Sequence, residues 1–273
     1  MEGRGAPFVD LALARRLEVA QTWRGVRYAR AHRELHPALP VQVEPLAGGY
    51  LIYTGDGMPL NRAVGLGVHG PLNAADFDLA EQFYRRRNLP LQIDVCPLAD
   101  GSLLELLSLR GYRLEKFYSV LFYPLPEPGA PESAPAGIRI SQAGPEDAEL
   151  WLKTVAQGFE ETDIPTQATL DVLAPNFYTS HAACFFAWVD GQPAGGGGMY
   201  VHEGAAEFGG ASTRPEFRRR GVQTALLHAR LAAAREQGCD LAMAMASPGS
   251  ASQRNIERVG FRLAYTKAVL VGS

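Results

Sequence analysis

The chain has 273 residues, of which 47% are hydrophobic and 20% are charged, and its formal net charge at pH 7 is −3. This length suits two domains of average size, and the composition excludes a disordered chain. The charge argues against a protein that coats nucleic acid or an anionic membrane, so we expect neither as a partner. No apolar run approaches the roughly 18 residues that span a bilayer, and the first residues do not form a signal peptide.

Three cysteines, Cys96, Cys184 and Cys239, are present without the spacing of a zinc site. An odd number of cysteines in this pattern favours free thiols in a reducing compartment over disulfides or a metal centre. We therefore expect a cytoplasmic protein that holds no metal.

Apolar periodicity predicts six elements in the first half of the chain. The expected strands are 49–53, 60–68, 91–96 and 112–123, and the expected helices are 74–87 and 102–109. A proline-rich segment follows, and its lack of a periodic apolar pattern is typical of an extended linker. We therefore divide the chain into a domain at 1–123, a linker at 124–136 and a second domain at 137–273.

The second half predicts a mixed α/β domain. The expected strands are 138–141, 183–189, 193–201, 205–213, 241–246 and 261–271, and the expected helices are 221–237 and 250–259, with a further helical segment that begins near Pro145. Asp190-Gly191 is a strong hairpin signal, which makes the central strands antiparallel. The run Gly195 to Gly198 lies inside a strand and predicts a bulge or a close backbone approach.

The two halves share an order of helix, strand, helix and strand. Gly111-Tyr112-Arg113-Leu114 lies 149 residues before Gly260-Phe261-Arg262-Leu263, and the same offset places strand 91–96 on the strand at 240–246. Self-similarity at a fixed offset indicates an internal repeat.

One helix start carries the pattern of an anion site. Strand 205–213 leads through Arg214-Pro215 and the run Arg218 to Arg220 into a helix that begins at Gly221. A helix start presents free N–H groups and the positive end of the helix dipole, and glycine lets an anion approach the backbone. Arginine adds paired hydrogen bonds to phosphate. The alternative is a set of solvated arginines before an ordinary helix.

The flanking residues resemble the GCN5-related N-acetyltransferase (GNAT) superfamily, whose signature is Gln/Arg-x-x-Gly-x-Gly/Ala at a strand-to-helix junction. The match here is Arg218-x-x-Gly221-x-Gln223, preceded by Pro215-Glu216-Phe217, followed by Thr224-Ala225-Leu226-Leu227 and closed by Gly260-Phe261. The resemblance covers residues 136 to 273. Gln223 departs from the small residue that the signature expects.

The resemblance implies that acetyl-CoA is the cosubstrate, with its pyrophosphate on the loop and helix start and its pantetheine arm along the strand before them. The residues implied in binding it are Ala211, Ser212, Thr213, Arg218, Arg219, Arg220, Gly221, Val222, Gln223, Thr224, Ala225 and Asn255. The reaction implied is direct attack of a primary amine on the thioester, with an acetyl group transferred to nitrogen. A small-molecule amine is favoured over a protein acceptor, and a homodimer is left open.

The proton transfers are assigned to two residues. Glu207 is the candidate base, because strand alternation places it on one face with Gly209 and Thr213; the alternative is a surface carboxylate. Many members of the family carry a tyrosine four residues before the closing glycine, and this tyrosine acts as the acid. That position here is Ile256, which cannot donate a proton, so Ser252 is the candidate acid. Ser250, Asn255 or a water molecule could also replace the tyrosine as the acid. The alternative is that these side chains only cap the helix, which is the commoner role of such residues.

The remaining candidates concern the acceptor. Glu160, Glu161 and Asp163 could attract a cationic amine, with a solvated acidic loop as the alternative. Phe177, Tyr178 and His181 could line the acceptor pocket or pack in the core, as Tyr265 would.

The expected fold class is α/β (α+β), with two GNAT-like domains that each have a mixed, mostly antiparallel twisted sheet flanked by helices. The first domain is expected to be a degenerate copy, because Asp76 and Asp78 place negative charge at its helix start, and His69 there is a lone loop histidine. One alternative function is an acyl-CoA-binding sensor or regulatory module without turnover. The other is a nucleotide-binding oxidoreductase, which the hairpin and the absence of Gly-x-Gly-x-x-Gly disfavour.

Overall fold

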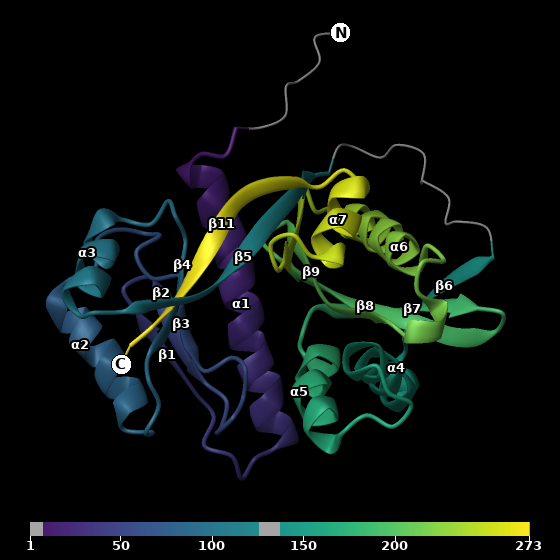
Figure 1. Cartoon of the computed structure of the whole chain (residues 1–273), viewed down its shortest axis with the longest axis horizontal. Helices are drawn as coiled ribbons and strands as arrows, with labels where there is room; N and C mark the ends of the chain where they lie inside the picture. Colours follow the sequence, from purple (N-terminus) through teal and green to yellow (C-terminus); the bar gives the residue numbers. More distant parts are fainter. Residues whose placement is uncertain (1–7, 126–136, 273) are drawn as a thin grey trace, which may run out of the picture.

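The computed structural model describes residues 8–125 and 137–272, in which a single 11-stranded sheet runs through the molecule between layers of helices (Figure 1). The helices are α1 (Leu11–Leu35), α2 (Ala74–Arg85), α3 (Gly101–Leu109), α4 (Ala148–Glu160), α5 (Gln167–Tyr178), α6 (Val222–Glu236) and α7 (Ala251–Arg258), with 3-10 turns η1 (Pro145–Asp147) and η2 (Pro215–Phe217). The strands are β1 (Gln42–Leu46), β2 (Gly49–Tyr53), β3 (Arg62–Val64), β4 (Gln92–Val95), β5 (Arg113–Pro124), β6 (Ile138–Gln142), β7 (Ala182–Val189), β8 (Gln192–His202), β9 (Ala205–Thr213), β10 (Leu241–Ala246) and β11 (Arg262–Val271). Among these residues no helix combines the length and the apolarity that a membrane crossing requires.

The two halves exchange their last strands. The strand order is β1-β2-β3-β4-β11-β5-β10-β9-β8-β7-β6, so β11 lies between β4 and β5, and β5 lies between β11 and β10. All of these pairings are antiparallel except β3 with β4 and β9 with β10. The predicted fold class, a mixed and mostly antiparallel sheet with flanking helices, is confirmed. The exchange joins the two predicted sheets into one.

The predicted repeat offset agrees with the observed elements. Shifting α2, β4, α3 and β5 by 149 residues superposes them on α6, β10, α7 and β11 to within two residues at every end. That the first half is a degenerate GNAT copy stays a prediction, and so do the domain boundaries. At the predicted linker, Pro124 ends β5 opposite Leu241 and Leu125 is buried, while 126–136 lie outside the described residues.

Helix α1 was not predicted from the sequence. It begins after Asp10, whose carboxylate accepts a hydrogen bond from the Leu13 N–H at 2.9 Å and so caps the helix. It crosses the molecule between the two groups of helices, where it contacts β2 on one side and α5, β8 and β9 on the other (Figure 1). Through α1 the first half of the chain therefore touches the second half directly.

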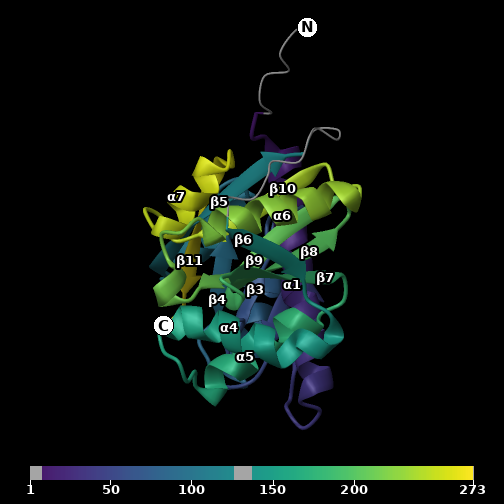
Figure 2. The ribbon, with the colours of Figure 1, turned by 90° about the vertical axis from the view of Figure 1, so that its right-hand side faces the viewer.

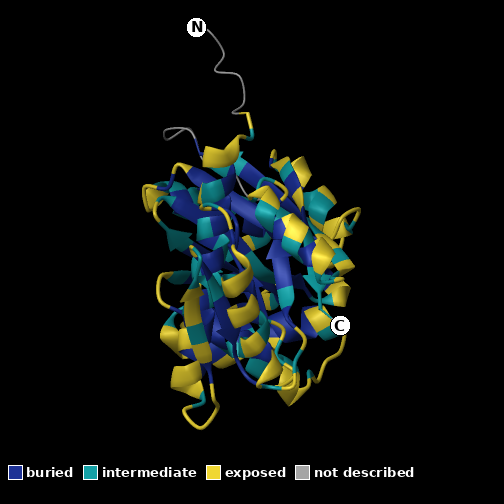
Figure 3. Ribbon diagram, turned by 90° about the vertical axis from the view of Figure 1, so that its left-hand side faces the viewer, coloured by how far each residue is buried: buried dark blue, intermediate teal, exposed yellow. Residues whose placement is uncertain are grey.

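Helices cover both faces of the second half of the sheet. Figure 2 shows α4 and α5 on one side of strands β6 to β9 and α6 on the other. The α6 face holds the larger core, with Phe185, Leu226 and Phe261 among its buried members, and Trp151 centres the core under α4. Figure 3 shows the same layering in the first half, where buried residues fill the strands and the inner helix faces.

A β-bulge interrupts the pairing of β8 with β9. Gly198 pairs with Gly209 and Gly196 with Ser212, so Gly197 faces two residues of β9. Gly210, one of these two, has a φ of 57°, a left-handed conformation that suits glycine. The predicted bulge in the glycine run is thus present, and it shifts the alternation of side chains along β9.

Candidate active site

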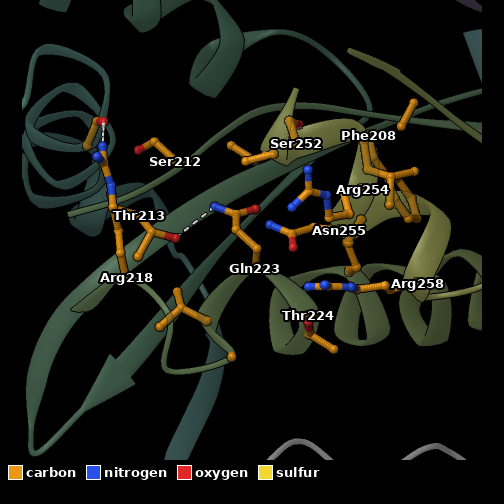
Figure 4. A pocket seen from close by; sticks show the side chains of 18 of the residues that line it. Phe208, Ser212, Thr213, Arg218, Gln223, Thr224, Ser252, Arg254, Asn255 and Arg258 are labelled. Carbon is orange, nitrogen blue, oxygen red and sulfur yellow. Dashed lines mark hydrogen bonds between the residues drawn. The ribbon is translucent and has the colours of Figure 1, made fainter. Parts of the chain in front are cut away.

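A cleft of about 820 Å³ opens where β9 and β10 diverge (Figure 4). The two strands pair in parallel only as far as Phe208 and Ala244, although β9 continues to Thr213. The start of α6 and one face of α7 form the other walls. Residues from these four elements and from the end of α4 line the cleft: Gly158, Phe159, Phe208, Gly209, Gly210, Ala211, Ser212, Thr213, Phe217, Arg218, Arg219, Gly221, Val222, Gln223, Thr224, Leu227, Arg230, Ala244, Met245, Ala251, Ser252, Arg254, Asn255, Ile256 and Arg258.

Helix α6 begins at this cleft without a side-chain cap. Gly221 precedes it with a φ of 86°, and the first turn contains no acidic residue. The first bond of the helix joins the Ala225 N–H to the Gly221 carbonyl at 3.0 Å, so the N–H groups of Val222, Gln223 and Thr224 have no acceptor among the described residues. By contrast, side chains cap the starts of α1, α2, α3, α5 and α7. The α6 start is therefore a preformed donor cluster for an anion.

The three arginines before α6 have different surroundings. Arg218 is fixed against α4, donating to Glu161 Oε1 at 2.7 Å and to the Gly158 carbonyl at 3.1 Å. Arg220 turns away and forms an ion pair with Asp190 at 3.0 Å, so it does not line the cleft. Arg219 does line the cleft, and has no hydrogen bond or ion pair in the part of the chain that the structure describes.

All of the predicted cosubstrate residues line the cleft except Arg220 and Ala225. Ala225 is fully buried, because it lies one turn inside α6 on the face that packs into the core. Gln223, which replaces the expected small residue, donates its side-chain amide to Thr213 Oγ1 at 2.9 Å (Figure 4). This bond ties the helix start to the end of β9.

The floor of the cleft contains a buried cation that sequence reasoning missed. Arg230 of α6 is 2% exposed and donates to the Leu226 carbonyl at 3.0 Å and the Gly198 carbonyl at 3.3 Å. Burial lowers its pKa to about 10, and no carboxylate pairs with it among the described residues. A Cβ at Gly197 would lie 3.1 Å from the Arg230 guanidinium, so the glycine run leaves room for this side chain.

The wall from α7 is polar at its edges and apolar in its centre. Ile256, at the position where the family's acid is expected, is buried and lines the cleft. Ser252 and Asn255 also line it and make no hydrogen bond within the described chain, whereas Ser250 accepts from the Gln253 N–H at 3.1 Å and caps α7. Ser250 is thereby accounted for as a cap, and Ser252 stays a predicted acid.

The predicted placement of Glu207 is wrong, because the bulge at Gly210 changes which residues share a face. Glu207 lies on the α1 side of β9, whereas Thr213 lies on the α6 side and meets Gln223. Glu207 is 2% exposed, pairs with Arg24 of α1 (Nη1 to Oε1, 3.0 Å) and does not line the cleft. Its Oε2 has no hydrogen-bond partner in the described chain. Burial acts to lower the pKa of Arg24, but Glu207 and Tyr200 together outweigh it and raise that pKa.

The predicted acceptor residues are mostly engaged within the chain. Glu160 accepts from the Thr166 N–H at 2.8 Å at the start of α5, and Glu161 binds Arg218. Phe177 packs on Trp151, with ring centroids 5.6 Å apart. The acidic run is thus largely a structural element that closes the turn between α4 and α5.

Two further arginines on α7 were not predicted as site residues. Arg254 and Arg258 line the cleft, and Figure 4 shows both side chains on the α7 wall on either side of Asn255. Their spacing of four residues puts them on one helix face, and this spacing could have identified them from the sequence.

Comparison with known proteins places the second half in a family. The model of the acetyltransferase (GNAT) family matches residues 150–261. This range begins in α4 and ends at the closing Gly-Phe pair, and it contains β9, the uncapped α6 start and α7. Residues 150–261 form a GNAT acetyltransferase domain. The predicted family is therefore confirmed for this part of the chain, while no curated protein sequence matches the chain significantly.

Solved structures resemble the chain over almost its whole length. A GCN5-related N-acetyltransferase from Kribbella flavida is 19% identical over 95% of each chain, with a TM-score of 0.68. A tandem GNAT protein from the clavulanic acid biosynthesis pathway is 15% identical over 94% of this chain and 96% of its own, with a TM-score of 0.60. A GNAT-family acetyltransferase from Colwellia psychrerythraea is 14% identical over 94% and 96%, with a TM-score of 0.53. At these identities the likeness establishes a shared fold for the GNAT domain together with the half that precedes it.

Proposed function

We propose that the chain is an acyl-CoA-dependent N-acetyltransferase that moves an acetyl group from acetyl-CoA to a primary amine. The observation that carries this proposal is the α6 start, where free N–H groups, a left-handed Gly221 and an unpaired Arg219 meet in one cleft of a GNAT domain. A pyrophosphate needs such a set of donors.

The shape of the cleft fits an extended arm beyond the pyrophosphate. The divergence of β9 from β10 opens a slot that runs from the α6 start to Phe208 and Ala244. Beyond Phe208 the floor along β9 consists of small residues, Gly209, Gly210 and Ala211. The bulge takes Gly210 and Ala211 out of the pairing with β8, and β10 no longer pairs with β9 beyond Phe208, which leaves backbone groups of this stretch available to a pantetheine amide.

The chemistry proposed is attack of a neutral amine on the thioester carbon, with the C–S bond breaking and the thiolate leaving. The chain must take one proton from the amine and can return one to the sulfur. Ser252 is the proposed donor to sulfur. Glu207 is the proposed acceptor through its free Oε2, although its ion pair with Arg24 also fits a purely structural role that holds α1 on the sheet.

Replacement of Glu207 by glutamine separates these two roles. As a base, Glu207→Gln is expected to lower kcat at neutral pH by about 100-fold or more, because the amide cannot accept the proton. The affinity for acetyl-CoA should stay the same. Turnover equal to that of the unaltered protein would show that Glu207 is structural.

The alternative is a protein that binds acyl-CoA without turnover, and the apolar Ile256 on the cleft wall is the observation that favours it. The release of free thiol from acetyl-CoA with a panel of small primary amines distinguishes the two. Tight CoA binding with no thiol release across a broad panel would support the binding module instead.

The central claim is tested at Gly221. Gly221→Val should weaken CoA binding, measured by calorimetry, by at least about tenfold, since a side chain blocks the anion and disfavours the left-handed backbone. Gly238→Val is the matched control, because Gly238 ends the same helix with a φ of 74° and has no atom within 4 Å of its Cβ position. Both variants carry the same kind of backbone strain. Equal CoA affinity in the two would remove the pyrophosphate site from the proposal.

A further inference from the structure

Three arginines line the cleft without any partner in the chain. Arg219 approaches from the loop before α6, and Arg254 and Arg258 approach from α7. None of their side chains makes a hydrogen bond, ion pair or ring contact within the described residues, whereas Arg214, Arg218 and Arg220 nearby are each paired with a carboxylate. The cleft therefore holds more positive charge than the chain neutralises.

The spacing of Arg254 and Arg258 makes this charge costly without a ligand. The two residues are four apart on α7, where like charges face each other and destabilise a helix. The acidic neighbour on the same helix, Glu257, forms no ion pair with either of them within the described residues and accepts a hydrogen bond from Gln253 at 2.8 Å. An anion held between the two guanidinium groups would relieve the repulsion.

Figure 4 shows the Arg258 guanidinium beside Thr224, at the edge of the α6 start, with Arg254 on the other side of Asn255. A pyrophosphate on the N–H groups of α6 would occupy the inner anion site. The α7 pair forms a second site next to it, on the facing wall of the cleft. A ligand that fills both sites carries a further anionic group close to its pyrophosphate, and in CoA the 3′-phosphate of the ribose is such a group.

We propose that Arg254 and Arg258 bind the 3′-phosphate of coenzyme A, so that the protein discriminates CoA from its 3′-dephospho form. The inference rests on the proposed function, because it takes CoA as the ligand of the α6 start. It adds a selectivity that the α6 start does not provide, since both forms carry the same pyrophosphate.

Calorimetry with CoA and with 3′-dephospho-CoA tests the proposal on the full chain. The unaltered protein should bind CoA about tenfold more tightly than dephospho-CoA, as expected for one well-placed charged hydrogen-bonded contact. The double variant Arg254→Gln/Arg258→Gln should bind dephospho-CoA unchanged and lose the preference for CoA. Arg33→Gln/Arg113→Gln removes two exposed arginines outside the cleft and should keep the preference, which controls for net charge.

Each other outcome overturns this inference or the proposed function. If the unaltered protein binds both forms equally, the arginines serve another anion, such as a carboxylate on the acceptor, and the inference fails while CoA binding stands. If the double variant weakens both forms by the same factor, the arginines act on the pyrophosphate and the inference also fails. If neither form binds, the proposed function itself is wrong.

Discussion

The two halves of the sheet place the same elements around a strand pair, yet the junction that opens into the cleft in the second half is covered by Leu103 in the first. Ala63 of β3 pairs with Ile93 of β4 as Ala206 of β9 pairs with Ala242 of β10. Ala63 and Ala206 are 143 residues apart, whereas Ile93 and Ala242 are 149 residues apart. The second half therefore has six more residues between the paired alanine and the matching position of its helix. These residues extend β9 to Thr213, whereas β3 ends at Val64, and the segments between strand and helix are of similar length.

The first half closes the space that the second half leaves open. By the 143-residue offset Gly67 corresponds to Gly210, and both have a left-handed φ. Leu103 of α3 lies over Gly67, where an added Cβ would come within 3.2 Å of its Cδ2. Ser252 holds the position of Leu103 in α7, by the 149-residue offset. A longer strand, β9, and a small residue on the facing helix thus distinguish the binding cleft from the filled strand junction.

The helix starts differ in the same sense. In the first half the side chain of Asn73 accepts a hydrogen bond from the Asp76 N–H at 2.9 Å, and Asp76 places its charge in the first turn. A capped, acidic start offers fewer free donors to a phosphate, and its carboxylate repels one. The assignment of CoA binding to the second half alone is a prediction that this contrast supports.

The largest expected effect concerns α1, through which the first half contacts the second. Arg24→Met should lower the free energy of unfolding by roughly 3 kcal/mol, because it leaves the Glu207 carboxylate buried without its cation. Urea denaturation measures the change. The double variant Arg24→Met/Glu207→Met should recover most of the loss, since it removes both charges. A double variant as unstable as Arg24→Met would show that packing, rather than the ion pair, holds α1 on β9.

A smaller effect is expected from making the second half resemble the first. Ser252→Leu should weaken CoA binding by about tenfold or more, because the side chain would occupy the slot as Leu103 does in the first half. Glu257→Leu adds the same side chain to α7 at an exposed position outside the cleft and is the matched control. If both variants bind CoA as the unaltered protein does, residue 252 does not distinguish the open half from the filled one.

Local sequence signals predicted most elements of this fold, and the failures have identifiable physical causes. The bounds of β9 and β10 were predicted correctly, because apolar strands flanked by a turn and a glycine leave little ambiguity. Helix α1 was missed because its buried face includes Glu18, Thr22 and His32, which interrupt the apolar period.

Non-local features could not be predicted in this way. The exchange of β5 and β11 leaves the apolar pattern of each strand unchanged, so no local signal reports it. Beyond the bulge at Gly210, the side chains of β9 point to the opposite faces from those that simple alternation predicts. The prediction therefore put Glu207 on the same face as Thr213, although the two lie on opposite faces. The α6 start, in contrast, was predicted because its anion site depends on contiguous residues.

The smallest expected effect concerns a surface contact between α1 and the second half. Arg16 of α1 donates to Asp240, just before β10, at 2.5 Å and 2.9 Å. The hydrogen bond from Arg16 lowers the pKa of Asp240 below its ordinary value of 3.8, against a smaller opposing effect of burial. A carboxyl whose pKa is lowered on folding contributes stability above its ordinary pKa and loses it as the pH falls through the folded value.

Arg16→Gln should therefore reduce the free energy of unfolding at pH 7 by about 0.5 kcal/mol or less, because both side chains are largely exposed and screened by solvent. The difference between the two proteins should shrink as the pH falls below 3.8, where Asp240 becomes protonated in both. Urea denaturation of both proteins at about pH 7, 5 and 3 measures this difference in the free energy of unfolding. A difference that stays constant down to the lowest pH would mean that Arg16 acts through packing on β10 instead of through its charge.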